Sequence, residues 1–199
     1  MSFRYRRLRR RLYPPVRRGR EMNRLILLDR DGVINFDSSE YIKGPSEWRP
    51  LPGALSAIAA LRNAGYLVGL CSNQAGVARG KLTDRDLDAV HAKMCQALAA
   101  HGAGLDFAAY CRHHPDDNCG CRKPRPGMLL GAMKALRAKP EHTWFVGDSI
   151  TDVQAALAAG CQPALVRSPD SNSLGQDAPA LDDVRVFENL ATFTRALLA

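Results

Sequence analysis

The sequence predicts a doubly wound α/β domain, in which helices cover both faces of a mainly parallel sheet. From Arg24 onward, short apolar runs alternate with longer segments of helical period, which is the order of strand–helix units in such folds. The apolar fraction of 46% and the charged fraction of 24% are those of an average globular protein. A length of 199 residues is enough for one domain with a single hydrophobic core.

Five short apolar segments, each bounded by polar residues or glycine, are predicted as strands that are buried on both faces. They cover residues 25–28, 67–71, 107–111, 143–146 and 164–167. Segments of helical period predict helices over residues 53–63, 84–100, 126–137, 152–159 and 190–198. Thr83 with Asp86 indicates a capping box at the start of the second helix, and Gly65, Gly102 and Gly160 indicate left-handed helix ends. Residues 168–183 are rich in Ser, Asp, Asn, Gly and Pro and are expected to form a loop.

The net charge of +8 is concentrated near the N-terminus. Residues 1–20 contain nine arginines and no acidic residue, which leaves residues 21–199 with a net charge of −1. Such an arm could bind a polyanion, because a run of cations that binds a polyanion releases its counterions. Blocks of like charge are usually disordered, however, and Met22 directly precedes the first predicted strand. We therefore expect residues 1–21 to be an Arg-rich disordered leader and residues 22–199 to be a single domain.

The apolar patterning argues against a membrane protein. No run approaches the ~20 apolar residues that span a bilayer, and no apolar stretch follows the arginines as in a signal peptide. We therefore expect a cytoplasmic protein. In that compartment the six cysteines are candidates for metal binding rather than for disulfides.

Polar residues follow the predicted strands at the edge where ligands bind in an open parallel sheet. Asp29 and Asp31 come after the first strand, Ser72 after the second and Asp148 after the fourth. Three carboxylates at one edge require a cation, and Mg²⁺ prefers such oxygen ligands. A metal held in this way suits a phosphorylated substrate, to which the Ser72 hydroxyl offers a hydrogen bond and Lys123 a positive charge.

These residues lie in four segments: Leu28-Asp29-Arg30-Asp31-Gly32, Cys71-Ser72-Asn73, Lys123, and Gly147-Asp148-Ser149-Ile150-Thr151-Asp152. In this order they resemble the motifs of the haloacid dehalogenase (HAD) phosphatase superfamily. The resemblance implies that Asp29 is the nucleophile, that Asp31 is the general acid and base, and that Ser72 and Lys123 stabilise the phosphoryl group. It also implies a Mg²⁺ site made by Asp29, Asp148 and the backbone carbonyl of Asp31, with Asp152 in a supporting position.

A second cluster places three cysteines and two histidines within eleven residues. Cys111, Cys119 and Cys121 with one histidine fit tetrahedral Cys₃His zinc. His113 fits the spacing of the pattern better than the neighbouring histidine does. All four positions are then filled by protein, so we expect a structural Zn²⁺ rather than a catalytic one.

The zinc loop is followed at once by Arg122-Lys123-Pro124, and residues 73–80 read Asn-Gln-Ala-Gly-Val-Ala-Arg-Gly. These features resemble the heptose-bisphosphate phosphatases and the related histidinol-phosphatase domains. The resemblance implies that residues 37–41, residues 72–75 and Arg122 contact substrate. The implied set is Asp37, Tyr41, Ser72, Asn73, Gln74, Ala75, Arg122 and Lys123. Two features depart from the family pattern: a zinc loop with five residues between His113 and Cys119, and Ser149 where many members carry lysine.

The spacing between the motifs leaves no room for a large cap domain. We expect a Mg²⁺-dependent phosphomonoester hydrolase that removes the 7-phosphate of D-glycero-D-manno-heptose 1,7-bisphosphate through an aspartyl-phosphate intermediate. Histidinol-phosphate phosphatase activity is the first alternative, and a polynucleotide-end phosphatase guided by the basic arm is the second. For the leading hypothesis the expected partner is a small phosphorylated sugar, with neither membrane nor nucleic acid involved, and the expected state is a monomer.

Overall fold

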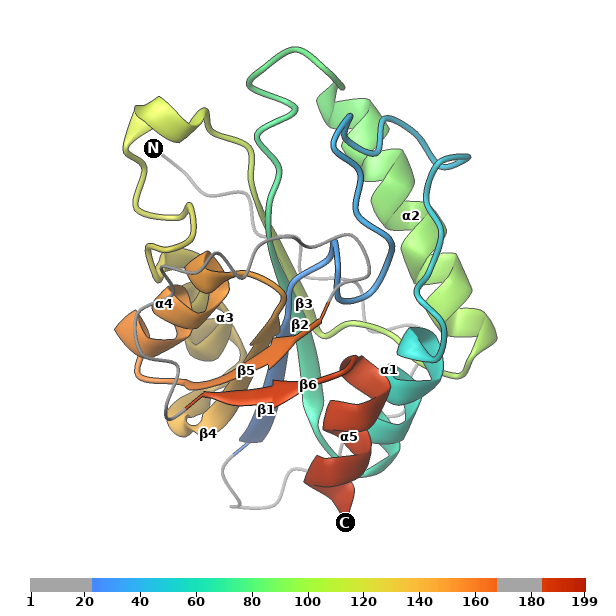
Figure 1. Cartoon of the computed structure of the whole chain (residues 1–199), viewed down its shortest axis with the longest axis vertical. Helices are drawn as coiled ribbons and strands as arrows, with labels where there is room; N and C mark the ends of the chain where they lie inside the picture. The colour runs from blue at the N-terminus through green and yellow to red at the C-terminus, as the bar shows by residue number, and fades with distance from the viewer. Residues whose placement is uncertain (1–22, 168–183) are drawn as a thin grey trace.

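The computed structural model describes residues 23–167 and 184–199 and contains one fully parallel sheet (Figure 1). The strand order is β3-β2-β1-β4-β5-β6. The strands are β1 (Asn23–Leu28), β2 (Leu67–Asn73), β3 (Phe107–Cys111), β4 (Ala138–Gly147), β5 (Gln162–Val166) and β6 (Arg185–Phe187). The helices are α1 (Ala54–Asn63), α2 (Asp84–Ala100), the short 3₁₀ helix η1 (Pro115–Asp117), α3 (Gly127–Leu136), α4 (Ile150–Ala158) and α5 (Leu190–Leu198).

The fold class and the five predicted strands and helices are confirmed, with ends that shift by a few residues. The strand β6 was missed, because it has three residues and carries no apolar run. The prediction for the fourth strand began too late, since β4 includes the polar, mostly exposed residues 139–142. Its pairing with β1 is irregular there, which explains why periodicity does not reveal it. The predicted leader and the predicted loop 168–183 lie outside the described residues.

Two helical layers enclose the sheet (Figure 1). Ile26 and Leu28 face the layer of α1, α2 and α5, whereas Leu25 and Leu27 face the layer of α3 and α4. All four side chains are completely buried. A strand covered on both faces has to be apolar at every position, and this is why β1 reads as a continuous hydrophobic run.

The chain order reverses between β1 and β4, which are adjacent in the sheet. The connections after these two strands therefore leave toward opposite faces and open a crevice at their carboxyl ends. The register pairs Leu28 with Val146, so Asp29 and Asp148 start their loops side by side. β2 lies on the other side of β1 and ends with Ser72 and Asn73. The topology thus brings three of the predicted motifs together.

Above this edge the loop after β2 leads into α2, and two further loops rise there, one after β1 and one after β3 (Figure 1). The first, loop 36–49, leaves and returns at one neck, where the Phe36 N–H donates to the Arg49 carbonyl at 3.1 Å and Asn35 pairs with Pro50. The second holds the cysteine cluster. Between residues 23 and 167, which the structure describes without a gap, no separate cap domain is inserted. In the described ranges, no helix is long and apolar enough to cross a membrane.

The helix ends follow the predicted local chemistry. Thr83 and Asp86 form the capping box at the start of α2. Gly65, Gly102 and Gly160 all have a positive φ just after their helices. Glycine adopts this left-handed conformation without the steric penalty that a Cβ would bring.

Candidate active site

Asp29 follows β1 directly and is held in the crevice from two sides. Its backbone N–H donates to the Val146 carbonyl at 2.9 Å, and its Oδ1 accepts from the Arg30 N–H at 2.7 Å. Its other oxygen lies 2.8 Å from the Lys123 Nζ. Burial raises the pKa of Asp29 to about 6, although the Lys123 ammonium lowers it. At neutral pH Asp29 is therefore largely a carboxylate, as a nucleophile must be.

Lys123 is a buried cation between two carboxylates. Its Nζ lies 2.6 Å from Asp152 Oδ1 as well as 2.8 Å from Asp29 Oδ2, and the side chain is almost completely shielded from solvent. Burial alone would lower the pKa of Lys123, but the two carboxylates raise it above its usual value. The Asn73 amide fixes the Lys123 backbone, since it donates to the carbonyl and accepts from the N–H, each at 3.1 Å.

Three carboxylates gather around this lysine. Oxygen atoms of Asp29, Asp148 and Asp152 lie within 4.8 Å of one another. Burial, together with the neighbouring charges of Asp29 and Asp152, raises the pKa of Asp148 to about 8. The raised pKa values show that three carboxylates here carry more negative charge than one lysine can balance. A hard divalent cation, which prefers oxygen ligands, would balance the remainder.

Asp152 is the carboxylate that organises the turn between β4 and α4. Its Oδ2 accepts from the Asp148 N–H at 3.2 Å, from the Ser149 N–H at 3.1 Å and from the Ser149 hydroxyl at 2.7 Å. Gly147 has to be glycine here, because a Cβ would lie 2.2 Å from the Asp152 Cβ. Asp152 therefore supports both Lys123 and the start of α4, in agreement with its predicted supporting position.

The Asp31 carboxylate is turned toward protein donors. Its Oδ1 accepts from Arg30 Nε at 2.9 Å and from Asn35 Nδ2 at 2.8 Å. Its Oδ2 accepts from Arg30 Nη2 at 3.0 Å and from Gln74 Nε2 at 2.8 Å. Its side-chain oxygens lie outside the group formed by Asp29, Asp148 and Asp152. Asp31 is thus close to Asp29 in sequence, but its side-chain hydrogen bonds are made to a different set of residues.

Gln74 joins the second motif to Asp31. Its Nε2 lies 3.2 Å from the Ser72 hydroxyl, and its Oε1 accepts from Arg30 Nη2 at 3.1 Å. Ser72, Gln74 and the adjacent Ala75 are all buried. The Gln74 amide thus contacts Arg30, Asp31 and Ser72, and its predicted contact with substrate stays a prediction.

A cavity of about 220 Å³ borders Asp31. Four residues of the predicted substrate set line it: Asp37, Tyr41, Asn73 and Gln74. A second cavity of about 530 Å³ lies within loop 36–49 and shares Asp37 and Tyr41 with the first. Arg122 has a buried Nη1 for which the described residues supply no hydrogen-bond partner. The remaining predicted residues, Ser72, Ala75 and Lys123, are buried beneath this surface.

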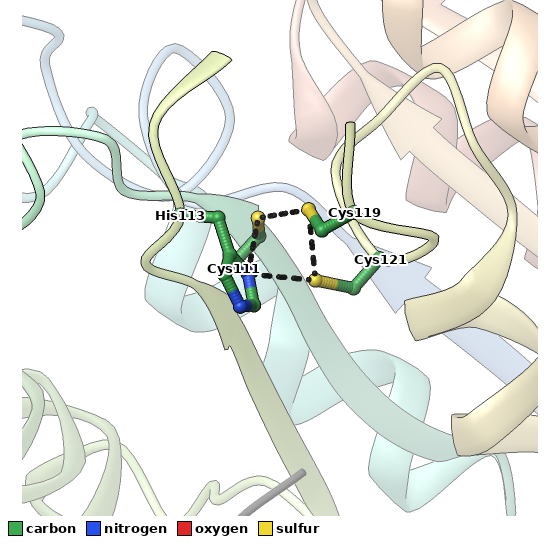
Figure 2. Close-up of side chains that lie close together, drawn as sticks. All are labelled: Cys111, His113, Cys119 and Cys121. Atoms are coloured by element: carbon green, nitrogen blue, oxygen red, sulfur yellow. Dashed lines mark hydrogen bonds between the residues drawn. The ribbon is translucent and has the colours of Figure 1, made fainter. Parts of the chain in front are cut away.

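The four predicted zinc ligands converge (Figure 2). The Cys119 sulfur lies 3.6 Å from that of Cys111 and 3.4 Å from that of Cys121, and the Cys121 sulfur lies 3.2 Å from His113 Nδ1. Zn–S bonds of about 2.3 Å in a tetrahedron imply sulfur separations of roughly 3.8 Å, so the cluster has the size of a zinc site. His114 is not part of it and instead pairs with Asp116.

The zinc loop packs against the chain that carries Lys123. The Gly127 N–H donates to the Gly120 carbonyl at 3.1 Å, and a Cβ on Gly127 would lie 2.3 Å from that oxygen. Arg125 donates to the Cys119 carbonyl at 2.9 Å. Because Lys123 is two residues after Cys121, the cluster fixes the path of the chain into the active site.

Sequence reasoning missed three residues around Asp31: Arg30, Asn35 and Trp48. Arg30 is 1% exposed and Asn35 is fully buried, although both are polar. The available signal was weak, namely an arginine between two acidic residues and an asparagine after the apolar pair Val33-Ile34. Neither pattern predicts what the side chain contacts.

Comparison with known proteins agrees with this geometry. A family model for haloacid dehalogenase-like hydrolases matches residues 20–160. The D-glycero-β-D-manno-heptose-1,7-bisphosphate 7-phosphatase of Pseudomonas aeruginosa is 44% identical over 175 residues, which are 87% of this chain and 97% of that protein. The corresponding enzyme of Pseudomonas putida is 43% identical over 176 residues, covering 88% and 99%.

A solved structure gives the same result. The D,D-heptose 1,7-bisphosphate phosphatase from B. bronchiseptica, crystallised with magnesium and phosphate, superposes with a TM-score of 0.83 at 45% identity, covering 88% of this chain and 98% of that one. Identity at this level over nearly the whole length of the relatives shows more than a common fold. The chain belongs to the haloacid dehalogenase-like hydrolases and, within them, to the family of the heptose-1,7-bisphosphate 7-phosphatases.

Proposed function

We propose that this enzyme removes the 7-phosphate of D-glycero-D-manno-heptose 1,7-bisphosphate and uses Mg²⁺ to do so. The observation that carries the proposal is the pairing of Asp29 with the buried Lys123 at the edge of a carboxylate cluster. This pairing places a nucleophile beside a fixed cation, as transfer of a phosphoryl group to an enzyme carboxylate requires. The substrate is taken from the names of the relatives, which this chain matches over their full length.

In the first step, an oxygen of Asp29 attacks phosphorus and the bond between phosphorus and the sugar oxygen breaks. The departing oxygen takes a proton from the carboxyl group of Asp31, so the sugar leaves as an alcohol. Lys123 and the Ser72 hydroxyl donate hydrogen bonds to the phosphoryl oxygens, whose charge is greatest in the transition state. The product of this step is a phosphorylated Asp29.

In the second step, water attacks the phosphorus of that intermediate. Asp31, now a carboxylate, takes the proton of the attacking water. The bond between phosphorus and the Asp29 oxygen breaks, inorganic phosphate leaves, and Asp29 is again a carboxylate. Asp31 has then received the proton that it gave away, so the cycle balances.

The residues present fit the implied metal ion. Asp29, Asp148 and the backbone carbonyl of Asp31 would hold Mg²⁺, with Asp152 beside them. When bound there, Mg²⁺ neutralises the carboxylates and the incoming phosphate and polarises the phosphoryl oxygens.

Cys111, His113, Cys119 and Cys121 would hold Zn²⁺ in a structural role, since the donor set is complete without water. A zinc–thiolate site and three further cysteines without a disulfide suit a reducing compartment, so the proposal includes a cytoplasmic location. It also includes a monomeric state and a small phosphorylated sugar as partner, rather than a membrane or nucleic acid.

A substrate panel tests the proposed function. The purified full-length protein is assayed with Mg²⁺ on heptose 1,7-bisphosphate, histidinol phosphate and a 5′-phosphorylated oligonucleotide, with the Asp29→Asn variant as a blank for contaminating phosphatases. We expect kcat/KM for the bisphosphate to exceed the others by at least about 10-fold. A larger kcat/KM for histidinol phosphate would reverse the assignment. Preference for the oligonucleotide that is lost on deletion of residues 1–21 would favour the polynucleotide hypothesis.

A further inference from the structure

Asn35 is a fully buried polar side chain between Asp31 and Trp48. Its Nδ2 donates to Asp31 Oδ1 at 2.8 Å and to the Phe36 carbonyl at 2.8 Å. Its Oδ1 accepts from the Trp48 indole at 2.9 Å. Both amide hydrogens and the amide oxygen thus have partners, which is the condition under which a buried amide stabilises one conformation.

The indole determines which way the Asn35 amide faces. Indole nitrogen is a donor and never an acceptor, so the amide must present its oxygen to Trp48. The amide NH₂ group is thereby directed to Asp31. Trp48 is 4% exposed and lies in loop 36–49 beside its neck, so its own position is fixed by packing.

Three side chains donate hydrogen bonds to the two oxygens of Asp31. Arg30 contacts both oxygens through its guanidinium, which fixes the plane of the carboxylate. Asn35 adds a donor to Oδ1 and Gln74 adds one to Oδ2. Arg30 and Gln74 come just after the central strands β1 and β2, whereas Asn35 is joined through Trp48 to the loop whose Asp37 and Tyr41 line the cavity next to Asp31.

We propose that Asn35 and Trp48 are positioning residues for Asp31, which hold its carboxylate in the orientation from which it serves the reaction and couple that orientation to loop 36–49. The inference rests on the proposed function to the extent that Asp31 is the acid and base of the reaction. Neither residue touches the phosphoryl group in this account. They affect turnover only by setting the orientation of the Asp31 carboxyl group.

The leaving group distinguishes this role from a structural one. A sugar alkoxide needs a proton in order to leave, whereas p-nitrophenolate leaves without one because a nitrophenol is far more acidic than an alcohol. Misorientation of Asp31 should therefore slow the first step, which kcat/KM reports, for a sugar phosphate and spare it for p-nitrophenyl phosphate. The second step, in which Asp31 is the base, is common to both substrates and does not enter kcat/KM. Damage to Asp29, Lys123 or the fold would slow both.

The first variant is Trp48→Phe, which removes the indole donor and retains an aromatic ring. The matched control is Trp144→Phe, the same substitution at the tryptophan of β4 that packs on Phe193 at 5.7 Å between ring centroids. For Trp48→Phe we expect kcat/KM on the sugar phosphate to fall about 10-fold, a part of what general acid catalysis contributes, with KM within about 2-fold. The kcat/KM on p-nitrophenyl phosphate should change less than about 3-fold, and Trp144→Phe should leave both values of kcat/KM unchanged.

The second variant, Asn35→Ala, removes the donor to Asp31 and is also combined with Trp48→Phe. Because Trp48 acts through Asn35, the double variant should lose no more rate than Asn35→Ala alone. Thermal unfolding of each variant, read beside the rates, shows whether it is folded. Equal loss on both substrates, loss on neither, or multiplying losses in the double variant would each overturn the inference.

Failure of the proposed substrate has a different signature. In that case the unaltered enzyme prefers another alkyl phosphate to the heptose bisphosphate. The preferred alkyl phosphate, such as histidinol phosphate, then replaces the heptose bisphosphate in the comparison with p-nitrophenyl phosphate. The test of the positioning role is otherwise the same.

Discussion

Replacement of Asp152 by alanine is expected to destabilise the protein strongly, although the residue belongs to the active-site cluster. Asp152 is 1% exposed and its two oxygens serve different elements. Oδ1 pairs with Lys123 at 2.6 Å, and Oδ2 accepts from the Asp148 and Ser149 N–H groups just before α4. One substitution therefore removes a buried ion pair and the N3 carboxylate of the capping box that Ser149 begins.

The size of the loss follows from these two contacts. Breaking one partner of a buried ion pair costs about 3–5 kcal/mol, and losing a helix N-cap costs about 1 kcal/mol. The variant gains something back, because Asp152 also raises the pKa of Asp29 and of Asp148 by repulsion. We expect a net loss of about 3–4 kcal/mol, which for a domain of this size lowers Tm by roughly 10 °C.

The assay is thermal and urea unfolding in buffer without added Mg²⁺, with Asp152→Ala and Asp152→Asn side by side. The asparagine variant retains an acceptor for the helix N–H groups and should lose less. Gln154→Ala, at an exposed position of the same helix, is the control and should leave Tm within about 2 °C. An Asp152→Ala protein with unchanged Tm would refute the reasoning, because the buried Lys123 would then not need its second carboxylate.

Three further predictions follow from the same contacts. Asp29→Asn should abolish turnover while Tm stays within a few degrees, because a neutral amide is a poor nucleophile; residual activity above the blank would place the nucleophile elsewhere. Cys119→Ala should lower bound zinc, measured by elemental analysis, and Tm by at least about 5 °C together, while Cys95→Ala, outside the cluster, should alter neither; a stoichiometric zinc content in the first variant would contradict the ligand set. Without Mg²⁺, stability should fall as pH rises from about 4 to 8, because the raised pKa of Asp148, about 8, lets the folded state hold a proton that the unfolded state has released. The increase in Tm on adding Mg²⁺ should then be larger at pH 8.5 than at pH 6, and an equal increase at both would count against this account.

The sheet could be predicted because its strands are buried on both faces. A run such as Leu25–Leu28 is apolar at every position, and only a covered central strand requires that. The edge strand β6 has no such requirement, since Arg185 and Val186 are exposed, and its sequence carries no corresponding signal. Burial therefore decides which strands can be read from sequence.

The same distinction applies to the active site. Asp29, Ser72 and Asp148 follow buried strands, so topology alone predicts that they meet. Asn35 and Trp48 are brought together by the return of loop 36–49 to its neck, and thirteen positions separate them along the chain. The sequence of an irregular loop has no hydrophobic periodicity, so it does not indicate which of its residues lie opposite each other. Its hydrogen bonds can be assigned only from the three-dimensional structure.

In an enzyme without a cap domain, short loops have to select the substrate and exclude water. A short loop has little core, so it needs an anchor that fixes it to the catalytic residues. The zinc loop has its cysteine cluster, and the Asn73 amide binds the backbone of Lys123, the residue that follows this loop, through two hydrogen bonds. Loop 36–49 has Trp48, and Asn35 transmits its position to Asp31. Loop 36–49 and the chain that follows the zinc loop are thus each joined through one amide, the buried Asn35 and the half-buried Asn73, to a charged group of the site, and a change in either segment should reach that group through the amide.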